Sequence, residues 1–165
     1  MIEETAIEVA VSCPAWRETL PEAEDLCRRA ARAACAAGRR GPLRRGPVEA
    51  SLVLADDDAL RTLNRDYRGR DKATNVLSFP ASETDSERAP GAPRMLGDVI
   101  VAFGTAAAEA AAQGKSLADH LSHLVVHGML HLLGHGHQTE ADAERMERLE
   151  TRVLAGLGVA DPYSA

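Results

Sequence analysis

The stretch HGMLHLLGHGHQ, from His127 to Gln138, holds four of the six histidines of this 165-residue chain. His127 and His131 are four residues apart, so in an α-helix they lie on one face, about a turn from each other. Gly134 is suited to end this helix, because glycine adopts the left-handed backbone conformation without steric cost. Leucines and valines surround the histidines. We therefore expect an apolar helix in the core of the protein, with histidines along one face.

The spacing of these histidines predicts a metal site. It reads H-x-x-x-H-x-x-G-x-x-H, the spacing of the metzincin zinc signature, in which two ligands come from a helix and the third follows its end. We predict that His127, His131 and His137 bind one zinc ion. Three imidazoles leave the fourth position of zinc for water, which distinguishes a catalytic site from a closed structural one. His120 and His123 lie one to two turns earlier and are not expected to be ligands.

The residue after the first histidine argues against peptide hydrolysis. Zinc peptidases place a glutamate there as the general base, whereas this chain has Gly128. A metallopeptidase would therefore need another base and stays as an alternative. Phosphodiester hydrolysis depends less on that residue, because a bound metal polarises a phosphoryl oxygen and lowers the pKa of water.

The order of sequence patterns predicts the fold class. Alternating or apolar runs predict strands over residues 5–12, 48–55, 74–80 and 96–103. Helices are predicted over residues 21–38, from 56 to about 66, from 104 onward, over 117–133 and over 139–157. We expect one α+β domain over residues 1–165: a small mixed four-stranded sheet packed with helices, with the zinc-site helix in the core. Asp98 in the last strand either orients a ligand histidine or only ends the strand.

Basic residues cluster although the chain as a whole carries a formal charge of -6. Residues 28–72 hold twelve Lys or Arg and six Asp or Glu, a net charge of +6. Such a surface suits the phosphates of a nucleic acid, the alternative being that the arginines only solvate helix faces. Because aromatic residues make up only 3% of the chain, stacking platforms for several bases are not expected. The last basic cluster comprises Arg61, Arg65, Arg68, Arg70 and Lys72.

Sequence features that relate to cellular location predict a cytoplasmic protein. The three cysteines, Cys13, Cys27 and Cys35, show no paired spacing and are expected to be free thiols. No apolar run of membrane-spanning length and no secretory leader pattern is found, so we expect a cytoplasmic protein with no membrane partner.

Three separated motifs resemble the YbeY family, the bacterial ribosomal-RNA maturation endoribonucleases. The resemblance covers roughly the last two thirds of the chain. It implies a zinc-dependent, single-strand-specific endoribonuclease of small-subunit ribosomal RNA maturation and ribosome quality control. Its partners would be single-stranded RNA, small-subunit ribosomal RNA and the ribosome or ribosomal proteins. The motifs are LNRDYRGRDKATNVLSFP (63–80), LGDVIV (96–101) and HGMLHLLGHGH (127–137), with a further similar segment, ERMERLETRVLAGLGVADPY (144–163).

The resemblance also implies roles for single residues. The family's three metal-binding histidines fall on His127, His131 and His137, and its functionally important arginine falls on Arg68. Arg68 would hold a phosphate oxygen and stabilise charge that develops at phosphorus. We predict that the neighbouring basic residues bind RNA: Arg61, Arg65, Arg70 and Lys72. Whether water or the 2'-hydroxyl of the RNA attacks is left open, as is a non-catalytic ribosome assembly factor that contains a structural zinc.

The chain departs from the family pattern at two places. His135 and Gly136 stand where the family usually has Tyr and Asp, and Ala73 stands where it usually has Pro. The missing Asp would remove an outer hydrogen bond of the kind that matters for metal affinity. His135 either substitutes for that contact or competes as a ligand.

Overall fold

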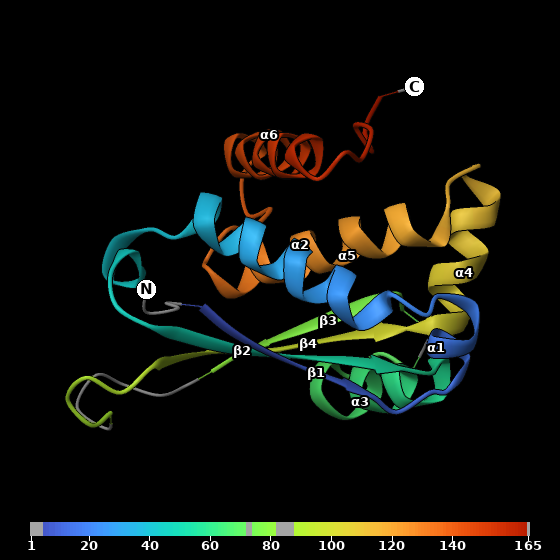
Figure 1. Cartoon of the computed structure of the whole chain (residues 1–165), viewed down its shortest axis with the longest axis horizontal. Helices are drawn as coiled ribbons and strands as arrows, with labels where there is room; N and C mark the ends of the chain where they lie inside the picture. Colours follow the sequence, from blue (N-terminus) through green and yellow to red (C-terminus); the bar gives the residue numbers. More distant parts are fainter. Residues whose placement is uncertain (1–4, 72–73, 82–87, 165) are drawn as a thin grey trace.

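A four-stranded sheet forms the centre of the molecule in the computed structural model, which describes residues 5–71, 74–81 and 88–164 (Figure 1). Strands β1, β2 and β4 are parallel, and β3 is antiparallel to β4. The sheet is therefore mixed and four-stranded, as predicted. Its order is β1-β2-β4-β3, formed by β1 (Thr5–Val11), β2 (Val48–Ala55), β4 (Arg94–Ala102) and β3 (Val76–Pro80).

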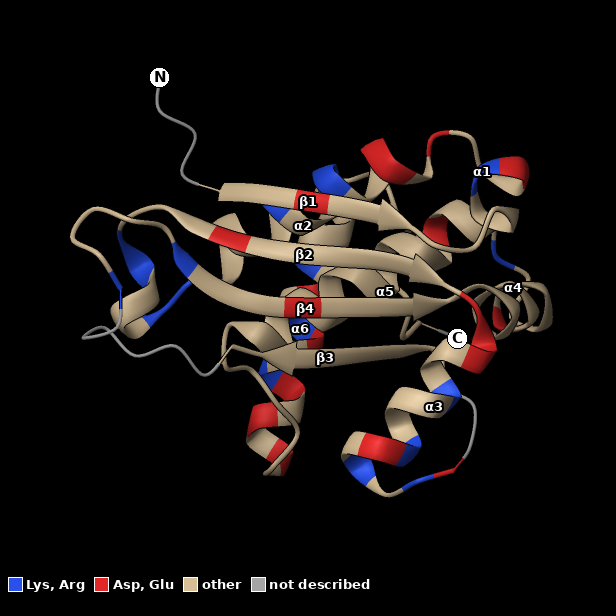
Figure 2. Ribbon diagram, turned by 90° about the horizontal axis from the view of Figure 1, so that it is seen from below, with Lys and Arg blue, Asp and Glu red and all other residues tan. Residues whose placement is uncertain are grey.

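Helices cover both faces of the sheet, which confirms the α+β class (Figures 1 and 2). Helices α2 and α5 lie on one face, and α6 packs on their outer side, so that α5 lies between the sheet and α6. Helix α3 packs on the opposite face. Helix α1 and a short 3-10 helix (Gly41–Arg44) were not predicted. The α-helices are α1 (Ala15–Thr19), α2 (Ala23–Gly38), α3 (Asp57–Arg68), α4 (Phe103–Ala112), α5 (Leu117–Leu132) and α6 (Glu140–Gly156).

Local sequence sets the helix ends that matter for the site. The Asp56 side chain accepts a hydrogen bond from the backbone N–H of Ala59 and so caps the start of α3. Gly69, at φ 68°, ends α3 in the left-handed conformation directly after Arg68. Ser116 caps α5 in the same way as Asp56 caps α3. The two ends of α3 place Arg68 beside β3. The Ser116 cap sets where α5, the helix that carries the histidines, begins.

A close approach between α5 and the sheet explains the glycine that follows His127. A Cβ atom built on Gly128 would lie 2.6 Å from Val99 Cγ1 on β4 and 3.2 Å from Ser78 Oγ on β3. The Ser78 hydroxyl also donates to the backbone carbonyl of Gly128 at 3.0 Å. Position 128 is therefore a packing position, and the helix approaches β3 and β4 because it has no side chain there.

The opposite face of the sheet shows that both predicted roles of Asp98 are wrong. Asp98 lies in the middle of β4, opposite Phe79, and its side chain is exposed. The next residue, Val99, is the one that faces α5. Because side chains alternate along a strand, Asp98 points to the face away from the histidines. It neither orients a histidine nor ends its strand.

The cysteines are free, as predicted, and two of them are buried. Burial raises the pKa of the Cys27 thiol to about 12, so it stays protonated. Within the described part of the chain, no helix is both long and apolar enough to cross a membrane.

Candidate metal centre

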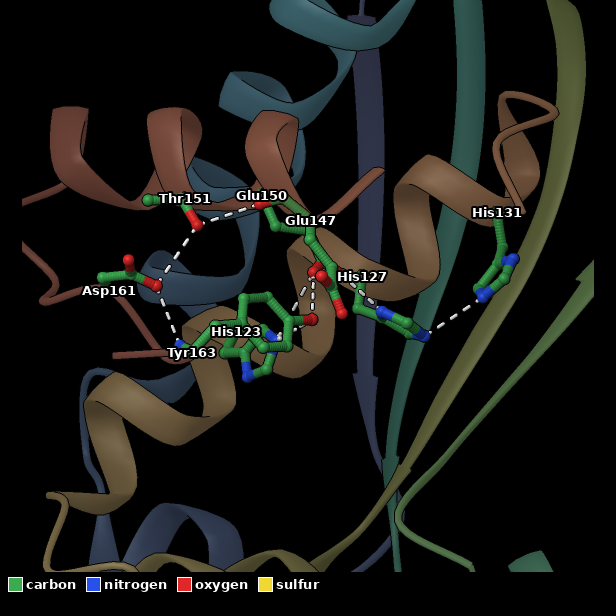
Figure 3. A network of polar contacts seen from close by, with 8 residues as sticks. All are labelled: His123, His127, His131, Glu147, Glu150, Thr151, Asp161 and Tyr163. Carbon is green, nitrogen blue, oxygen red and sulfur yellow. Dashed lines mark hydrogen bonds and ion pairs between the residues drawn. The ribbon is translucent and has the colours of Figure 1, made fainter. Parts of the chain in front are cut away.

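His127 and His131 project side by side from α5 (Figure 3). Their Nε2 atoms face each other at 3.0 Å, and the centroids of the two rings lie 4.6 Å apart. Both side chains are partly buried, the His127 side chain being 23% exposed. The four-residue spacing therefore brings the two imidazoles together, as the sequence predicted.

Hydrogen bonds at the other nitrogens define the tautomers of these rings. His127 Nδ1 contacts a carboxylate oxygen of Glu150, and His131 Nδ1 lies 3.0 Å from the backbone carbonyl of His135. Because both oxygens can only accept, we assign the N–H to Nδ1 in each ring. Both Nε2 atoms then carry lone pairs that face each other, an arrangement that a cation would stabilise. Metal-bound histidines typically donate their second N–H in this way.

The ring of the third predicted ligand lies beside the other two. The His137 ring is stacked on His127, with centroids 5.4 Å apart and planes at 22°, and its centroid is 5.3 Å from that of His131. Gly134, at φ 95°, turns the chain back after α5 and allows this approach. His137 is exposed, so the cluster is open toward solvent on that side. The structure thus brings together His127, His131 and His137.

The protonation state of His131 suits a ligand. Burial, followed by the neighbouring His127 and His137, lowers the pKa of His131 to about 4. The ring is therefore neutral near pH 7 and keeps the lone pair that a metal ion requires.

Glu150 is a residue of the candidate site that was not predicted from the sequence. It is fully buried on α6, and its carboxylate accepts hydrogen bonds from His127 Nδ1 and from the hydroxyl of Tyr163. Burial alone raises the pKa of Glu150, but the nearby His123 ring and the hydrogen bond from His127 outweigh it and hold the pKa at about 2. The signal was present in the sequence, because Glu150 shares the apolar face of α6 with Met146 and Val153.

A second set of potential ligands shares His127 with the first. Ligand atoms of His123, His127 and Glu150 all lie within 4.8 Å of one another and could hold a metal ion. His123 Nε2 lies 3.8 Å from a Glu150 oxygen. The Glu150 oxygens already accept from His127 and Tyr163, however, which makes this set less open than the facing Nε2 atoms. The ligand-atom distances among the described residues thus support a metal site at His123, His127 and Glu150. The predicted set of His127, His131 and His137 stays a prediction, which rests on the facing Nε2 atoms and on the ring contacts of His137.

His120 is buried next to His123, with ring centroids 6.2 Å apart, but belongs to neither ligand set. Its Nε2 lies 2.9 Å from a carboxylate oxygen of Glu109 on α4, and the same carboxylate accepts from the side-chain amide of Asn75 at 3.0 Å. Asn75 precedes β3 and lines the cavity beside the metal cluster. Glu109 and His120 therefore fix the position of Asn75, another residue that the sequence reasoning did not select.

Arg68 reaches the same cavity from the other face of the sheet. The cavity has a volume of about 460 Å³. The Arg68 guanidinium donates from Nη2 to the Ser78 carbonyl at 3.1 Å and lies 6.0 Å from the centroid of the Phe79 ring. An exposed cation with one hydrogen bond to the backbone of β3 therefore lines the same cavity as two of the predicted ligands. The residues around the cavity include Arg68, Asn75, His123, His127, His131 and Tyr163.

The other basic residues predicted to bind RNA lie outside the lining of this cavity. Arg61 pairs with Asp71 at 2.7 Å, and Arg65 pairs with Asp66 at 3.1 Å, all on the surface. Figure 2 shows these charges along α3 and the loop that follows it. Arg70 is exposed just after α3, and Lys72 lies outside the described residues, as does Ala73. The structure thus brings Arg68 to the histidines and leaves Arg61, Arg65 and Arg70 on the outer surface.

His135 is oriented toward α2. Its Nε2 lies 2.9 Å from the backbone carbonyl of Gly38, at the C-terminal end of that helix. Its own carbonyl accepts from His131 Nδ1. His135 therefore supplies an outer contact to the predicted ligand His131 through its backbone, while its side chain contacts the end of another helix.

Comparisons with known proteins identify the family and a similar fold. The sequence model of the family described as Endoribonuclease YbeY matches residues 17–158. A protein named Endoribonuclease YbeY from Paramagnetospirillum magneticum is 56% identical over 160 residues, covering 95% of this chain and 96% of that protein. One of the same name from Bradyrhizobium sp. is 48% identical over 158 residues, covering 95% and 91%. The solution structure of TM1509 from Thermotoga maritima has a similar fold, with a TM-score of 0.52 at 20% identity, covering 96% of this chain and 99% of that one.

Proposed function

The chain belongs to the YbeY family of endoribonucleases, and we propose that it is a zinc-dependent endoribonuclease specific for single-stranded RNA. One observation carries the proposal: the facing Nε2 atoms of His127 and His131 line the same cavity as the guanidinium of Arg68. A site that joins a metal to a fixed cation suits cleavage of a phosphodiester, whose charge must be stabilised in the transition state.

We assign the zinc ligands to His127, His131 and His137. The outward hydrogen bonds of the first two rings support this set, because they leave both Nε2 lone pairs available. Three neutral imidazoles suit zinc, and the exposure of His137 leaves room for a fourth ligand from solvent. When bound, zinc would polarise the phosphate and lower the pKa of water.

We assign Arg68 a catalytic role and the basic residues around it a role in RNA binding. The planar guanidinium of Arg68 can donate two hydrogen bonds to one phosphate, and its contact with the Ser78 carbonyl limits its motion. Exposed cations on and after α3 would attract the RNA backbone without touching the reacting atoms. These are Arg61, Arg65, Arg70 and Lys72.

The biological setting proposed here follows from the family resemblance. The substrate would be small-subunit ribosomal RNA, processed during maturation and ribosome quality control in the cytoplasm. The ribosome or ribosomal proteins would be its partners.

Two other functions compete with this proposal. A metallopeptidase needs a general base, and the position after His127 cannot supply one, since any side chain at Gly128 would meet Val99. A ribosome assembly factor with a structural zinc would use the same histidines but would close the fourth position of the metal. The cavity of about 460 Å³ beside His127 and His131 favours an open site.

Metal analysis combined with cleavage assays tests the proposal. The purified protein should contain one zinc per chain and cleave an unstructured RNA, but neither an RNA duplex nor an unstructured protein. A chelator should abolish cleavage, and added zinc should restore it. One bound zinc without RNA cleavage would favour the assembly factor, and hydrolysis of the protein substrate would favour the peptidase.

A further inference from the structure

Tyr163 is an exposed aromatic residue that is held firmly in place after the last helix (Figure 3). The residue as a whole is 45% exposed, yet its hydroxyl donates to the fully buried Glu150. Its backbone N–H donates to Asp161 Oδ1 at 2.8 Å, and the same oxygen accepts from the Thr151 hydroxyl at 3.3 Å. The ring is also perpendicular to that of His123, with centroids 5.6 Å apart. Both the backbone and the side-chain end of Tyr163 are therefore fixed.

The position of this ring relates it to the metal centre. Tyr163 lines the cavity that contains Arg68, His127 and His131. It also lines a second, larger cavity of about 860 Å³ between the end of α2 and α6. Tyr163 therefore borders both cavities, and in the smaller one it lies with His127 and His131.

Support of Glu150 accounts for only part of this arrangement. The buried carboxylate needs the hydroxyl as a donor, and burial together with the bond to Glu150 raises the pKa of Tyr163, so the phenol stays protonated. That bond does not require an aromatic ring to be half exposed at the edge of a cavity. Exposed rings that are held rigid lose little conformational entropy when they bind a flat partner.

We propose that the Tyr163 ring is a stacking platform for one nucleobase of the RNA next to the phosphate that Arg68 contacts. The proposal rests on the function proposed above and adds a contact to the base where that function has contacts only to phosphate. Stacking on one ring is tolerant of sequence, because every base has a flat face. It also favours single strands, since a base in a duplex is already stacked on its neighbours. The low aromatic content of the chain is compatible with a single platform.

Single-turnover cleavage with the zinc-loaded full-length protein tests this contact. The RNA is an unstructured oligonucleotide with one 2-aminopurine, and matched oligonucleotides carry one abasic site at successive positions. The protein concentration at half-maximal rate reports binding. Quenching of 2-aminopurine fluorescence before cleavage reports stacking.

The variants separate the ring from its hydroxyl. Tyr163→Leu should raise the half-saturating protein concentration roughly tenfold, the scale of one lost base–aromatic stack, and should remove the quenching. In the wild type, an abasic site at one RNA position should raise the half-saturating protein concentration by the same factor. In Tyr163→Leu, that abasic site should cause no further increase. Tyr163→Phe keeps the ring and loses the bond to Glu150, so it should keep most of the stacking. Tyr67→Leu changes the other tyrosine, which is 72% exposed and does not line the cavity, and should leave the abasic effect unchanged.

The outcomes separate this proposal from the proposed function. Suppose that the wild type cleaves the RNA, and that Tyr163→Leu still responds to the abasic site and still quenches 2-aminopurine as the wild type does. The stacking proposal is then wrong, and the proposed endoribonuclease function is unaffected. A Tyr163→Phe variant that loses as much as Tyr163→Leu would also overturn stacking, because the hydroxyl would then account for the effect. If the wild type neither binds nor cleaves single-stranded RNA, both proposals are wrong.

Discussion

The two ends of the histidine row on α5 differ in what their rings contact. At the first end, His120 and His123 each have a buried Nδ1 without a hydrogen-bond partner among the described residues. Their Nε2 atoms face carboxylates of α4 and α6. At the second end, His127 and His131 use Nδ1 for an outward hydrogen bond and turn Nε2 toward each other. One residue type at helical spacing thus has two roles, because neighbours from other elements decide which nitrogen is free.

Removal of one histidine from each end should give the largest contrast. His131→Ala should lose the zinc and all RNA cleavage, because one of two facing ligands is gone, whereas His123→Ala should keep one zinc per chain. Metal content of the purified variants measures this directly. Both variants should fold, which circular dichroism can verify.

The opposite result would reverse the comparison. If His123→Ala loses the metal and His131→Ala keeps it, the ligands are His123, His127 and Glu150, the second set whose ligand atoms lie within 4.8 Å of one another.

Arg68 allows the next test, which contrasts the cavity with the outer surface of α3. Arg68→Ala should lower the rate of single-turnover cleavage at saturating protein by roughly a hundredfold, the scale of losing one positioned charge stabiliser. Arg68→Lys keeps the charge but loses the planar fork and should also be impaired. Arg65→Ala is the control: it should weaken RNA binding modestly and flatten its salt dependence, with the saturated rate unchanged.

Zinc content should stay at one per chain in all three arginine variants. A wild-type saturated rate for Arg68→Lys and Arg68→Ala would make Arg68 one more cation of the surface, equivalent to Arg65.

A substitution at Glu150 tests whether the hydrogen bond from His127 Nδ1 to this carboxylate matters for metal binding at the His127 and His131 end of the row. Glu150→Gln keeps the shape and a hydrogen-bond acceptor for His127 but removes the negative charge. Zinc affinity should fall by about ten- to a hundredfold, the usual cost of changing an outer partner of a ligand histidine. Competition with a chromophoric chelator measures this without reference to activity. Complete loss of zinc would instead identify Glu150 as a direct ligand.

The fold was largely predictable because its signals are local. Strand alternation over residues 48–55 matches β2, and the helix predicted from residue 56 matches α3, which Asp56 caps. The histidine spacing could be interpreted in the same way, since His127 and His131 belong to one helix. Asp98 shows the limit, because the face of the sheet that receives α5 depends on the register of β4 with its neighbours.

The rest of the site depends on contacts between distant segments. Glu150 is 23 residues from His127, and the bond between them exists only because α6 packs on α5. Asn75, before β3, and Tyr163, after α6, reach the cavity from segments that are far apart in the chain. A buried charge on an apolar helix face was the one sequence signal for Glu150, and it does not say which residue the charge contacts.

A substitution at His135 should have the smallest effect. It tests the place where the histidine motif of this chain departs from the usual pattern of the family. Its backbone carbonyl orients His131, and this contact survives any change of side chain. Its ring contacts Gly38 of α2 instead of the facing Nε2 atoms. His135→Tyr should therefore leave zinc content and the saturated cleavage rate unchanged. Stability should fall by only about 1 kcal/mol, the net value of one hydrogen bond, measured as the free energy of unfolding in urea. If the variant loses zinc, His135 is a ligand, and the contrast between the two ends of the histidine row would have to extend into the loop after α5.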